Sequence, residues 1–375
     1  MITQPVYFDH NATTLLSPEA LLAMSQVYQF PYNTSAVHQL GNQANKLVNE
    51  VRKNLQNLLN AHNYEVIFTS GSTEATNTVF NGIKDVSDIL FSTIEHSSVF
   101  NCRPYGKKIT EITSNQHAII NIYDLQEKLP KHSNFLVSAM LANNETGSIQ
   151  PVAEIAKIVH QKSGLIHCDI VQAVGKIKVD LEELNVDFAS VSAHKFGGPQ
   201  GVGALLVRKG LDIEPLILGS KQEKGKRAGS LNVAGIVGFA VACQQAKENL
   251  VEFAKISGLI DKLQQGLKTI CGDNLQIFSQ EVPRIANTLF FSVAKQNSQI
   301  ALIHCDLHNI CLSAGSACSS GSINQSRILK ALATDAKFWQ GGLRISLGLS
   351  NTQEEIDYFL NIYQQFYQLQ QKLCQ

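Results

Sequence analysis

Short apolar runs alternate with helical patterns through the first two thirds of the chain. Several of these runs are apolar on both faces, which is typical of strands in a parallel sheet that helices cover on both sides. The strands predicted in this way are Glu65–Ser70, Asp88–Thr93, Phe135–Leu141, Leu165–Ile170, Phe188–Ser192 and Val202–Val207. The pattern therefore predicts a large α/β domain.

Two of the segments between strands carry apolar residues at helical spacing. Such residues recur between Leu47 and Leu59, and again in the segment that contains Ile155 and Val159. Gly164 follows the second of these helices and predicts a glycine cap at its C-terminal end.

From about residue 250 the pattern changes. A long helical stretch precedes three predicted strands and a last helix, whose start is marked by the capping-box pair Thr352 and Glu355. This order predicts a smaller α+β domain. Its strands are Asn287–Val293, Ile310–Ser313 and Leu343–Leu347.

The length of 375 residues is more than one simple core usually holds, which favours two domains. The first fifteen residues are too few to fold alone, so they are expected to join another body. We predict that residues 16–250 form the large domain and that residues 1–15 and 251–375 form the small one.

Composition narrows the class of protein. A hydrophobic fraction of 44% and a charged fraction of 17% are those of an ordinary globular protein. A formal net charge of +0 gives no indication of direct nucleic-acid binding through bulk electrostatics. No apolar run is long enough to span a bilayer and the N-terminus lacks the layout of a signal peptide, so a cytoplasmic location without membrane contact is expected.

The chain has 8 cysteines, and no two of them form a Cys-x-x-Cys pair. In a long chain without a secretory segment, reduced thiols are expected. The triplets His167–Asp169 and His304–Asp306 resemble metal-ligand runs. Adjacent side chains on a strand point to opposite faces, so we predict no metal site there.

Lys195 is an unusual lysine because it follows a buried-type strand and precedes Phe196 and a Gly-Gly-Pro turn. Most lysines are solvated at the surface. Desolvation would lower the pKa of this amine and allow it to attack an aldehyde. Ser192 and His194 lie close to it in the chain, and both are predicted to face a phosphate group.

Asp169 falls where a predicted strand ends, and open parallel sheets bind ligands at the carboxyl ends of their strands. A carboxylate there can keep a pyridine nitrogen protonated. The alternative is a buried acid that accepts hydrogen bonds from the backbone. Gln172, three residues later, can donate to a phenolic oxygen or simply begin a helix.

Gly71, Ser72 and Thr73 lie where a predicted strand turns into a helix. Backbone N–H groups and hydroxyls at such a helix start bind phosphate, helped by the helix dipole. The alternative is an ordinary N-cap, for which serine and threonine are favoured. The position of these residues ahead of Asp169 and Lys195 favours the phosphate site.

Cys318 lies in a run of serine, glycine and alanine, which packs weakly and is not the apolar setting of a structural cysteine. As a nucleophile at neutral pH its thiol would need a cation or an acid–base partner nearby. Arg344 lies within an apolar strand, where its partner is expected to be a substrate carboxylate or an internal acid.

An amine that forms an imine, a carboxylate that pairs with a ring nitrogen and an accessible thiol are the parts needed for sulfur chemistry on pyridoxal phosphate (PLP). With these residues, the chain resembles the cysteine desulfurases of the nitrogen-fixation and iron–sulfur-cluster type, within the class V aminotransferase group of fold-type-I PLP enzymes. The segments that carry the resemblance are Phe8-Asp9, Ala12–Thr14, Thr69–Glu74, Glu95-His96, Asn143–Gly147, Asp169, Gln172, Ser192–Lys195, Arg227–Ser230, the Cys318 loop and Arg344.

The resemblance implies a role for each residue of the site. Lys195 would hold PLP covalently and later move protons at the substrate Cα, and Asp169 would pair with the pyridinium nitrogen. Gln172 would bind the phenolic oxygen, and His96 would stack on the ring and assist proton transfer. The phosphate would be bound by Ser72, Thr73, Ser192 and His194, with Ser230 reaching the phosphate of a neighbouring subunit. The substrate carboxylate would be held by Asn144, Arg344 and Asn33.

The resemblance also implies the fold, the reaction and the partners. The large domain would have a mostly parallel sheet of the seven-stranded type, and the enzyme would be a homodimer. L-cysteine would yield L-alanine and a persulfide on Cys318, which would pass sulfur to a cluster scaffold or a thiolation protein.

Some positions depart from the family pattern. Asn33 is followed by threonine rather than proline, and Ser230 stands where threonine is usual. His10 occupies a place where an aromatic or other residue is usual, and the chain ends at Gln375 without the longer tail of some relatives. The acceptor of the sulfur is therefore not identified.

Two alternative functions are also considered. One is another PLP enzyme of the group, such as a selenocysteine lyase or an aminotransferase, although an aminotransferase needs no thiol. The other is a non-catalytic relative that acts as a binding partner. The presence of Lys195, Asp169, His96 and Cys318 favours an active desulfurase.

Overall fold

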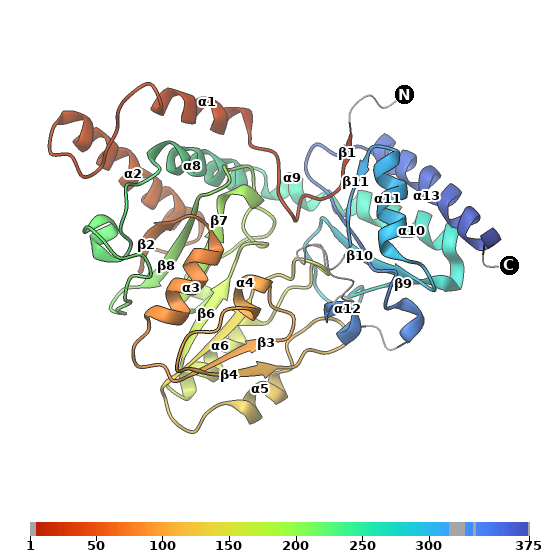
Figure 1. Cartoon of the computed structure of the whole chain (residues 1–375), viewed down its shortest axis with the longest axis horizontal. Helices are drawn as coiled ribbons and strands as arrows, with labels where there is room; N and C mark the ends of the chain where they lie inside the picture. The colour runs from red at the N-terminus through yellow and green to blue at the C-terminus, as the bar shows by residue number, and fades with distance from the viewer. Residues whose placement is uncertain (1–4, 315–326, 333–334, 374–375) are drawn as a thin grey trace.

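The computed structural model describes residues 5–314, 327–332 and 335–373 (Figure 1). Its larger part is built around a seven-stranded sheet. In the order of the sheet, the strands are β2 (Tyr64–Thr69), β8 (Gly203–Arg208), β7 (Phe188–Ser192), β6 (Leu165–Asp169), β5 (Phe135–Met140), β3 (Asp88–Ser92) and β4 (Lys108–Ile112). Strand β8 is antiparallel to both of its neighbours, and the other neighbouring strands are parallel. The mostly parallel sheet predicted from the sequence is confirmed.

Helices cover both faces of this sheet, because consecutive residues of the strands are apolar and point to opposite faces. In β2, Ile67 packs in one apolar cluster with Val79 of α3, whereas Val66 and Phe68 pack in another with Leu55 of α2. The helices of this part are α1 (Pro18–Val27), α2 (Gln39–Leu58), α3 (Ser72–Gly82), α4 (Ser97–Phe100), α5 (Ile122–Lys128), α6 (Val152–Gln161), α7 (Leu181–Leu184), α8 (Val233–Glu248) and α9 (Leu250–Ala254), with short 3₁₀ turns η1 (Ala193–Lys195) and η2 (Gln222–Gly225).

The smaller part has a four-stranded antiparallel sheet in the order β12 (Ser313–Ala314), β13 (Leu343–Ser346), β10 (Thr288–Val293) and β9 (Leu275–Ile277). The N-terminal strand β1 (Val6–Tyr7) pairs in parallel with β11 (Ile310–Cys311). The remaining elements are α10 (Ser257–Cys271), η3 (Gly272–Asn274), α11 (Ser298–Leu307), α12 (Arg327–Leu332), η4 (Ala336–Phe338) and α13 (Gln353–Leu373).

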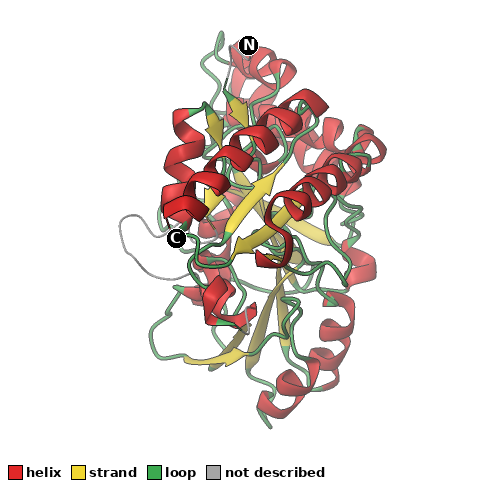
Figure 2. Ribbon diagram, turned by 90° about the vertical axis from the view of Figure 1, so that its right-hand side faces the viewer, coloured by secondary structure: helices red, strands yellow, loops and turns green. Residues whose placement is uncertain are grey.

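This smaller part has an apolar core of its own, to which Phe8, Leu263, Phe291 and Tyr363 belong. Helices lie over its strands on the side that faces the viewer in Figure 2. In the described parts of the chain, no helix combines the length and the apolar character that a membrane crossing requires.

The last helix begins at the predicted capping box. The backbone N–H of Thr352 donates to the Glu355 carboxylate over 3.0 Å, and the N–H of Glu355 donates to the Thr352 hydroxyl over 3.3 Å. These two bonds satisfy N–H groups that the first turn of a helix leaves without an intrahelical partner. The prediction is confirmed.

Two details of the sequence interpretation are wrong. The left-handed residue that ends α6 is Ser163, with φ of 56°, and not Gly164. Gly164 is required for another reason, since a Cβ there would lie 2.2 Å from the ring of Phe135. The segment Ile310–Ser313 is not one strand, because β11 pairs with β1 while β12 pairs with β13 in a different sheet.

Candidate active site

The site lies at the carboxyl edge of the large sheet. Strands β3, β5, β6 and β7 run parallel, so the residues that follow them emerge at one edge. His96 follows β3, Asn144 follows β5, Asp169 ends β6 and Lys195 follows β7. Four of the predicted site residues are therefore brought to the same edge by strand direction alone.

Lys195 is held against the N-terminal segment of the chain. Its Nζ donates to the backbone oxygens of Asn11 and Ala12 over 2.8 Å and 2.7 Å. The side chain is half-buried and lies at the end of η1, directly after β7. Lys195 is therefore not a solvated surface group, and this agrees with the prediction from the sequence.

Asp169 is a buried carboxyl beside this lysine. Its Oδ1 accepts a hydrogen bond from the backbone N–H of Val171 over 2.9 Å. Burial raises the pKa of Asp169 to about 6, and the Val171 N–H and the charge of Lys195 act in the opposite direction. A cationic ring nitrogen placed against this carboxyl would stabilise its ionised form.

Gln172 belongs to a buried cluster with two residues that the sequence interpretation missed, Asn11 and Lys176. Its Nε2 donates to the backbone oxygen of Asn11 over 2.9 Å, and its Oε1 accepts from Lys176 Nζ over 2.5 Å. Lys176 follows Gln172 by four residues between apolar neighbours, and that setting was the available signal. Asn11 gave none, because its partners are far away in the sequence.

The start of α3 meets the end of β7. The backbone N–H of Ser72 donates to the Ser192 hydroxyl over 2.8 Å, and the Ser72 hydroxyl donates to that of Ser190 over 2.9 Å. Thr73, in the first turn of α3, is exposed. Ser72 and Ser192 are thus in contact at a helix N-terminus, where an anion is favourable.

His194 lies outside the strand that carries Ser192. Strand β7 ends at Ser192, and His194 lies in the short turn η1 that follows it. The His194 Nδ1 lies 3.1 Å from the hydroxyl of Thr13. Burial and then the charge of Lys195 lower the pKa of His194 to about 4, which keeps its ring neutral at physiological pH.

His96 caps the short helix α4. Its Nδ1 accepts a hydrogen bond from the backbone N–H of Ser98 over 3.1 Å and lies 2.8 Å from the Ser98 hydroxyl. Because Nδ1 is the acceptor, the neutral ring carries its proton on Nε2. The cap therefore sets both the orientation and the tautomer of this histidine.

Arg344 is paired with an internal acid. In β13, its guanidinium donates to Asp9 Oδ1 over 2.5 Å and to the backbone oxygen of Asn144 over 3.0 Å. The internal ion pair that the sequence left open is therefore present. Two buried polar atoms of these residues, Arg344 Nε and Asn144 Oδ1, have no hydrogen-bond partner among the described residues.

The other predicted residues lie apart from this cluster or outside the described residues. Asn33 is exposed between α1 and α2, where its Oδ1 accepts from the N–H of Ser35 over 2.9 Å. Ser230 is exposed in a loop that the Arg227–Glu74 ion pair, 3.0 Å between Nε and Oε1, fastens to α3. Cys318 lies outside the described residues.

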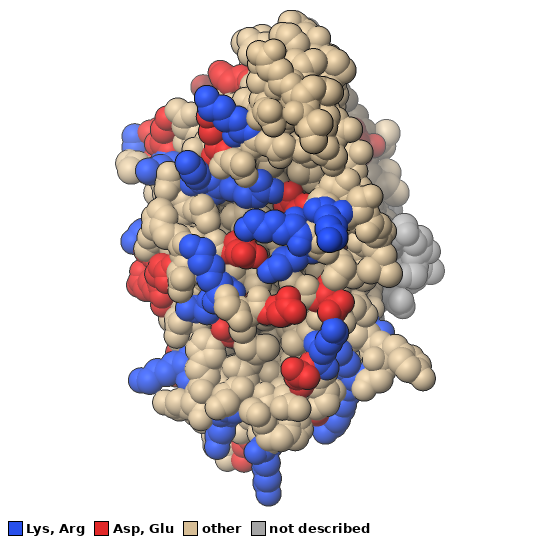
Figure 3. Space-filling view, turned by 90° about the vertical axis from the view of Figure 1, so that its left-hand side faces the viewer, with Lys and Arg blue, Asp and Glu red and all other residues tan. Residues whose placement is uncertain are grey.

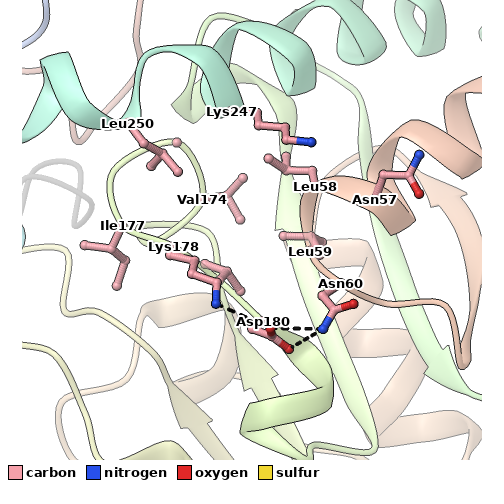
Figure 4. Close-up of a pocket in the computed structure, with 12 residues that line it drawn as sticks. Asn57, Leu58, Leu59, Asn60, Val174, Ile177, Lys178, Asp180, Lys247 and Leu250 are labelled. Carbon is pink, nitrogen blue, oxygen red and sulfur yellow. Dashed lines mark hydrogen bonds and ion pairs between the residues drawn. The ribbon is translucent and has the colours of Figure 1, made fainter.

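Within the described part of the chain, no three His, Cys, Asp or Glu side chains are grouped closely enough to hold a metal ion. A surface cavity of about 300 Å³ lies elsewhere, between α2, the segment after β6 and the end of α8 (Figure 4). None of the predicted site residues lines it, so it is separate from the candidate active site.

The chain is similar to known proteins over nearly its whole length. The chain is 35% identical to the protein named cysteine desulfurase IscS from Clostridium botulinum, over 96% of this chain and 94% of that protein. It is 36% identical to the protein of the same name from Dictyoglomus turgidum, over 95% and 93% of the two chains. The structure of a NifS-like protein from Rickettsia africae matches with a TM-score of 0.90 and 33% identity, covering 97% of this chain and 100% of that one.

The aminotransferase class-V family model matches residues 6–359, which include both parts of the fold and the whole candidate site. The enzymes of this family depend on PLP, and the lysine and the buried carboxyl of the site are the groups that PLP requires. The chain therefore belongs to the class-V aminotransferase family of PLP-dependent enzymes.

Proposed function

We propose that this chain is a cysteine desulfurase that converts L-cysteine to L-alanine and leaves the sulfur as a persulfide on Cys318. The arrangement that carries the proposal is the placement of Lys195, Asp169 and His96 after parallel strands of one sheet. Relatives named cysteine desulfurase at 35% and 36% identity over nearly the full length support the same activity.

The residues of the site fit PLP. Lys195 provides the amine for its aldehyde, and Asp169 provides a buried carboxyl for its ring nitrogen. The Ser72 N–H, which here donates to a hydroxyl oxygen, is placed to donate to a phosphate oxygen at the start of α3. When bound, PLP supplies an electron-accepting ring for the electron pair that remains after the substrate Cα loses its proton.

The protein groups hold the reactants and move protons. Lys195, whose amine would hold PLP, would also take the proton from the substrate Cα. Asp169 would pair with the ring nitrogen of the cofactor and favour its cationic form, in which the ring accepts electrons. His96, with its Nδ1 held by the Ser98 N–H, would use its Nε2 for proton transfer.

The sulfur transfer is balanced without a further oxidant. The Cys318 thiolate attacks the substrate sulfur, an S–S bond forms, and the substrate Cβ–S bond breaks. The carbon takes the electron pair of that bond and a proton to become the methyl group of L-alanine. The two sulfurs are oxidised to the persulfide level as the carbon is reduced.

The six described cysteines are poor candidates for the nucleophile themselves, which leaves Cys318 and Cys374 of the eight. All six, at positions 102, 168, 243, 271, 305 and 311, are free thiols, and five of them are buried. Burial raises the pKa of each, to about 11 for Cys102 and about 12 for Cys271 and Cys305. Thiols with such pKa values are protonated at neutral pH and react slowly.

The test is to supply L-cysteine to the wild type and to a Cys318→Ala variant that retains bound PLP. We expect the wild type to release L-alanine in amounts matched by persulfide and sulfide, and the variant to form no protein persulfide. Cys311→Ala is the matched control, which should retain the activity. A Cys318→Ala variant with full sulfur transfer would contradict the proposal, as would a borohydride-trapped pyridoxyl adduct at a residue other than Lys195.

The oligomeric state and the sulfur acceptor of the enzyme are proposals as well. We infer that the enzyme acts as a homodimer and delivers sulfur to a cluster scaffold or a thiolation protein. Residues 20–45 contain no Lys, Arg, Asp or Glu, yet Leu22 and Tyr28 in this stretch are 61% and 70% exposed. Figure 3 shows a large area without charged side chains at its upper end, where α1 lies in Figure 1. A second copy of the chain would cover this area. The cytoplasmic location of the enzyme stays a prediction.

A further inference from the structure

Lys176 is a buried lysine for which the proposed mechanism has no use. Its side chain is 5% exposed, and its Nζ donates to two side-chain oxygens, Gln172 Oε1 over 2.5 Å and Asn11 Oδ1 over 2.7 Å. In the described residues, no carboxylate lies within ion-pair distance of it. A buried amine without an acidic partner is costly, so its two short hydrogen bonds call for an explanation.

The contact with Gln172 defines which way the carboxamide points. The two ends of a glutamine amide have nearly the same shape, but one end only accepts hydrogen bonds and the other only donates. The Lys176 amine donates, so it selects the orientation with Oε1 toward Nζ. The Gln172 nitrogen is then turned toward the backbone oxygen of Asn11, 2.9 Å away.

That same backbone oxygen also accepts from Lys195 Nζ over 2.8 Å. The Gln172 nitrogen and the cofactor-binding amine therefore share one acceptor, so a group bound to Lys195 lies within reach of the Gln172 donor. With the amide reversed, an oxygen would face that group instead, and it would repel a phenolate oxygen.

We propose that Lys176 is a positioning residue that fixes the Gln172 carboxamide with its nitrogen toward the phenolic oxygen of PLP. This inference rests on the proposed roles of Lys195 and Gln172 in holding the cofactor. Two features of the fold maintain the arrangement. Gln172 and Lys176 lie one turn apart in the same turn segment, and Gly175 brings this segment against Phe196, since a Cβ at Gly175 would lie 2.8 Å from that of Phe196.

The charge state of Lys176 is compatible with this role. Burial, together with the positive charges of Lys195 and Arg344, holds the pKa of Lys176 well below its usual range. The amine has N–H groups to donate in either protonation state, and the two side-chain oxygens accept from it. Burial and then the positive charge of Lys176 lower the pKa of the nearby His10 to about 4, so the His10 ring is neutral at physiological pH.

The test uses the absorbance of the bound cofactor, which titrates with pH, in the purified holoenzymes of the wild type, Lys176→Met, Gln172→Leu and the double variant. Loss of a hydrogen bond to the phenolate should raise the pKa of the cofactor chromophore by about one pH unit in each single variant. Because both substitutions remove the same bond, the double variant should shift no further than a single one.

Val174→Ala is the matched control, since Val174 is a buried residue of the same turn segment. It should lower the melting temperature and leave the absorbance titration as in the wild type. If Lys176→Met does not yield folded holoenzyme, Lys176→Gln replaces it and the same shift is expected, because an amide both donates and accepts and no longer selects one orientation.

A Lys176→Met holoenzyme that titrates like the wild type, while Gln172→Leu shifts, would overturn the inference. Additive shifts in the double variant would overturn it as well. Both results leave the desulfurase proposal intact. Failure of the wild type to form a pyridoxyl adduct at Lys195 would instead contradict the proposed site itself.

Discussion

His167 is a fully buried histidine in the middle of the large sheet. Its Nδ1 lies 2.8 Å from the Ser138 hydroxyl and its Nε2 lies 3.1 Å from that of Ser190, so it joins β5, β6 and β7 through their side chains. Burial lowers the pKa of His167 to about 3, and the folded protein therefore holds it neutral.

Because His167 is buried and neutral, we expect the free energy of unfolding of the protein to fall in acid. Between its unfolded pKa of about 6.5 and its folded pKa of about 3, the unfolded chain binds the extra proton, so stability falls as pH falls. Asp169 has the opposite sign, since its raised pKa favours the folded state in mild acid. On going from pH 7.5 to 5.0, we expect His167→Gln to lose about 2 kcal/mol less free energy of unfolding than the wild type.

The measurement is denaturant unfolding of the two proteins at both pH values. His62→Gln, a change at an exposed histidine, is the control and should follow the wild type. Equal pH dependence of the His167→Gln variant and the wild type would show that the buried ring does not titrate in this way.

Single residues differ in how well the sequence predicted them. Lys195 and Asp169 were found because a strand direction and a local pattern fix their positions. Asn11 and Lys176 were not found from the sequence, because their importance comes from their contact with each other across 165 positions of the chain. The pairing of Arg344 with Asp9, across 335 positions, was left as an alternative for the same reason.

At the scale of elements, the start of α3 depends on a close approach of three backbones. A Cβ on Gly203 in β8 would lie 2.4 Å from the oxygen of Val191 in β7 and 2.7 Å from the Cα of Gly71. Gly71 precedes the first turn of α3, whose Ser72 N–H is proposed to bind phosphate. Glycine at position 203 therefore keeps the proposed phosphate site in contact with the sheet.

We expect Gly203→Ala to separate these backbones, to lower the stability by about 1–3 kcal/mol and to weaken PLP binding at least tenfold. The measurements are thermal unfolding and titration of the apoenzyme with PLP. Gly258→Ala is the control, since a Cβ at this helical position meets nothing within 4 Å and should be neutral or stabilising. A Gly203→Ala variant with the PLP affinity of the wild type would contradict the close-approach argument.

Elements with a continuous apolar run were predicted well, because burial on both faces leaves a clear pattern. The edge strand β4 was missed, since Lys108 and Glu111 are exposed and the pattern there is mixed. The division between β11 and β12 was missed because partner strands, and not local residues, decide which sheet each of them joins.

At the scale of the whole molecule, we propose the division into a large domain of residues 16–250 and a small domain of residues 1–15 and 251–375. The separate apolar core that contains Phe8 and Tyr363 supports it. So does the pairing of β1 with β11, which ties the first residues to the C-terminal part. Lys195 of the proposed large domain donates a hydrogen bond to the backbone oxygen of Asn11 of the proposed small domain.

Because the proposed dimer interface includes the surface of α1, we expect a charged side chain there to weaken the dimer. Leu22→Glu should shift the mass in sedimentation at micromolar concentration from twice 41.1 kDa toward 41.1 kDa, because a carboxylate in an apolar interface has to be desolvated. Leu369→Glu, a change at a leucine that is 55% exposed on α13, is the control and should leave the mass unchanged. A Leu22→Glu variant with the mass of the wild type would place the interface elsewhere.

The parallel pairing of β1 with β11 also has a consequence for biosynthesis. Val6 lies opposite Ile310, so its partner does not exist until the ribosome has added more than three hundred further residues. At about 5–20 residues per second, this interval is roughly 15–60 s. Throughout it, the segment that contacts Lys195 has no strand to pair with. The site for the cofactor is therefore completed only after Ile310 has been synthesised.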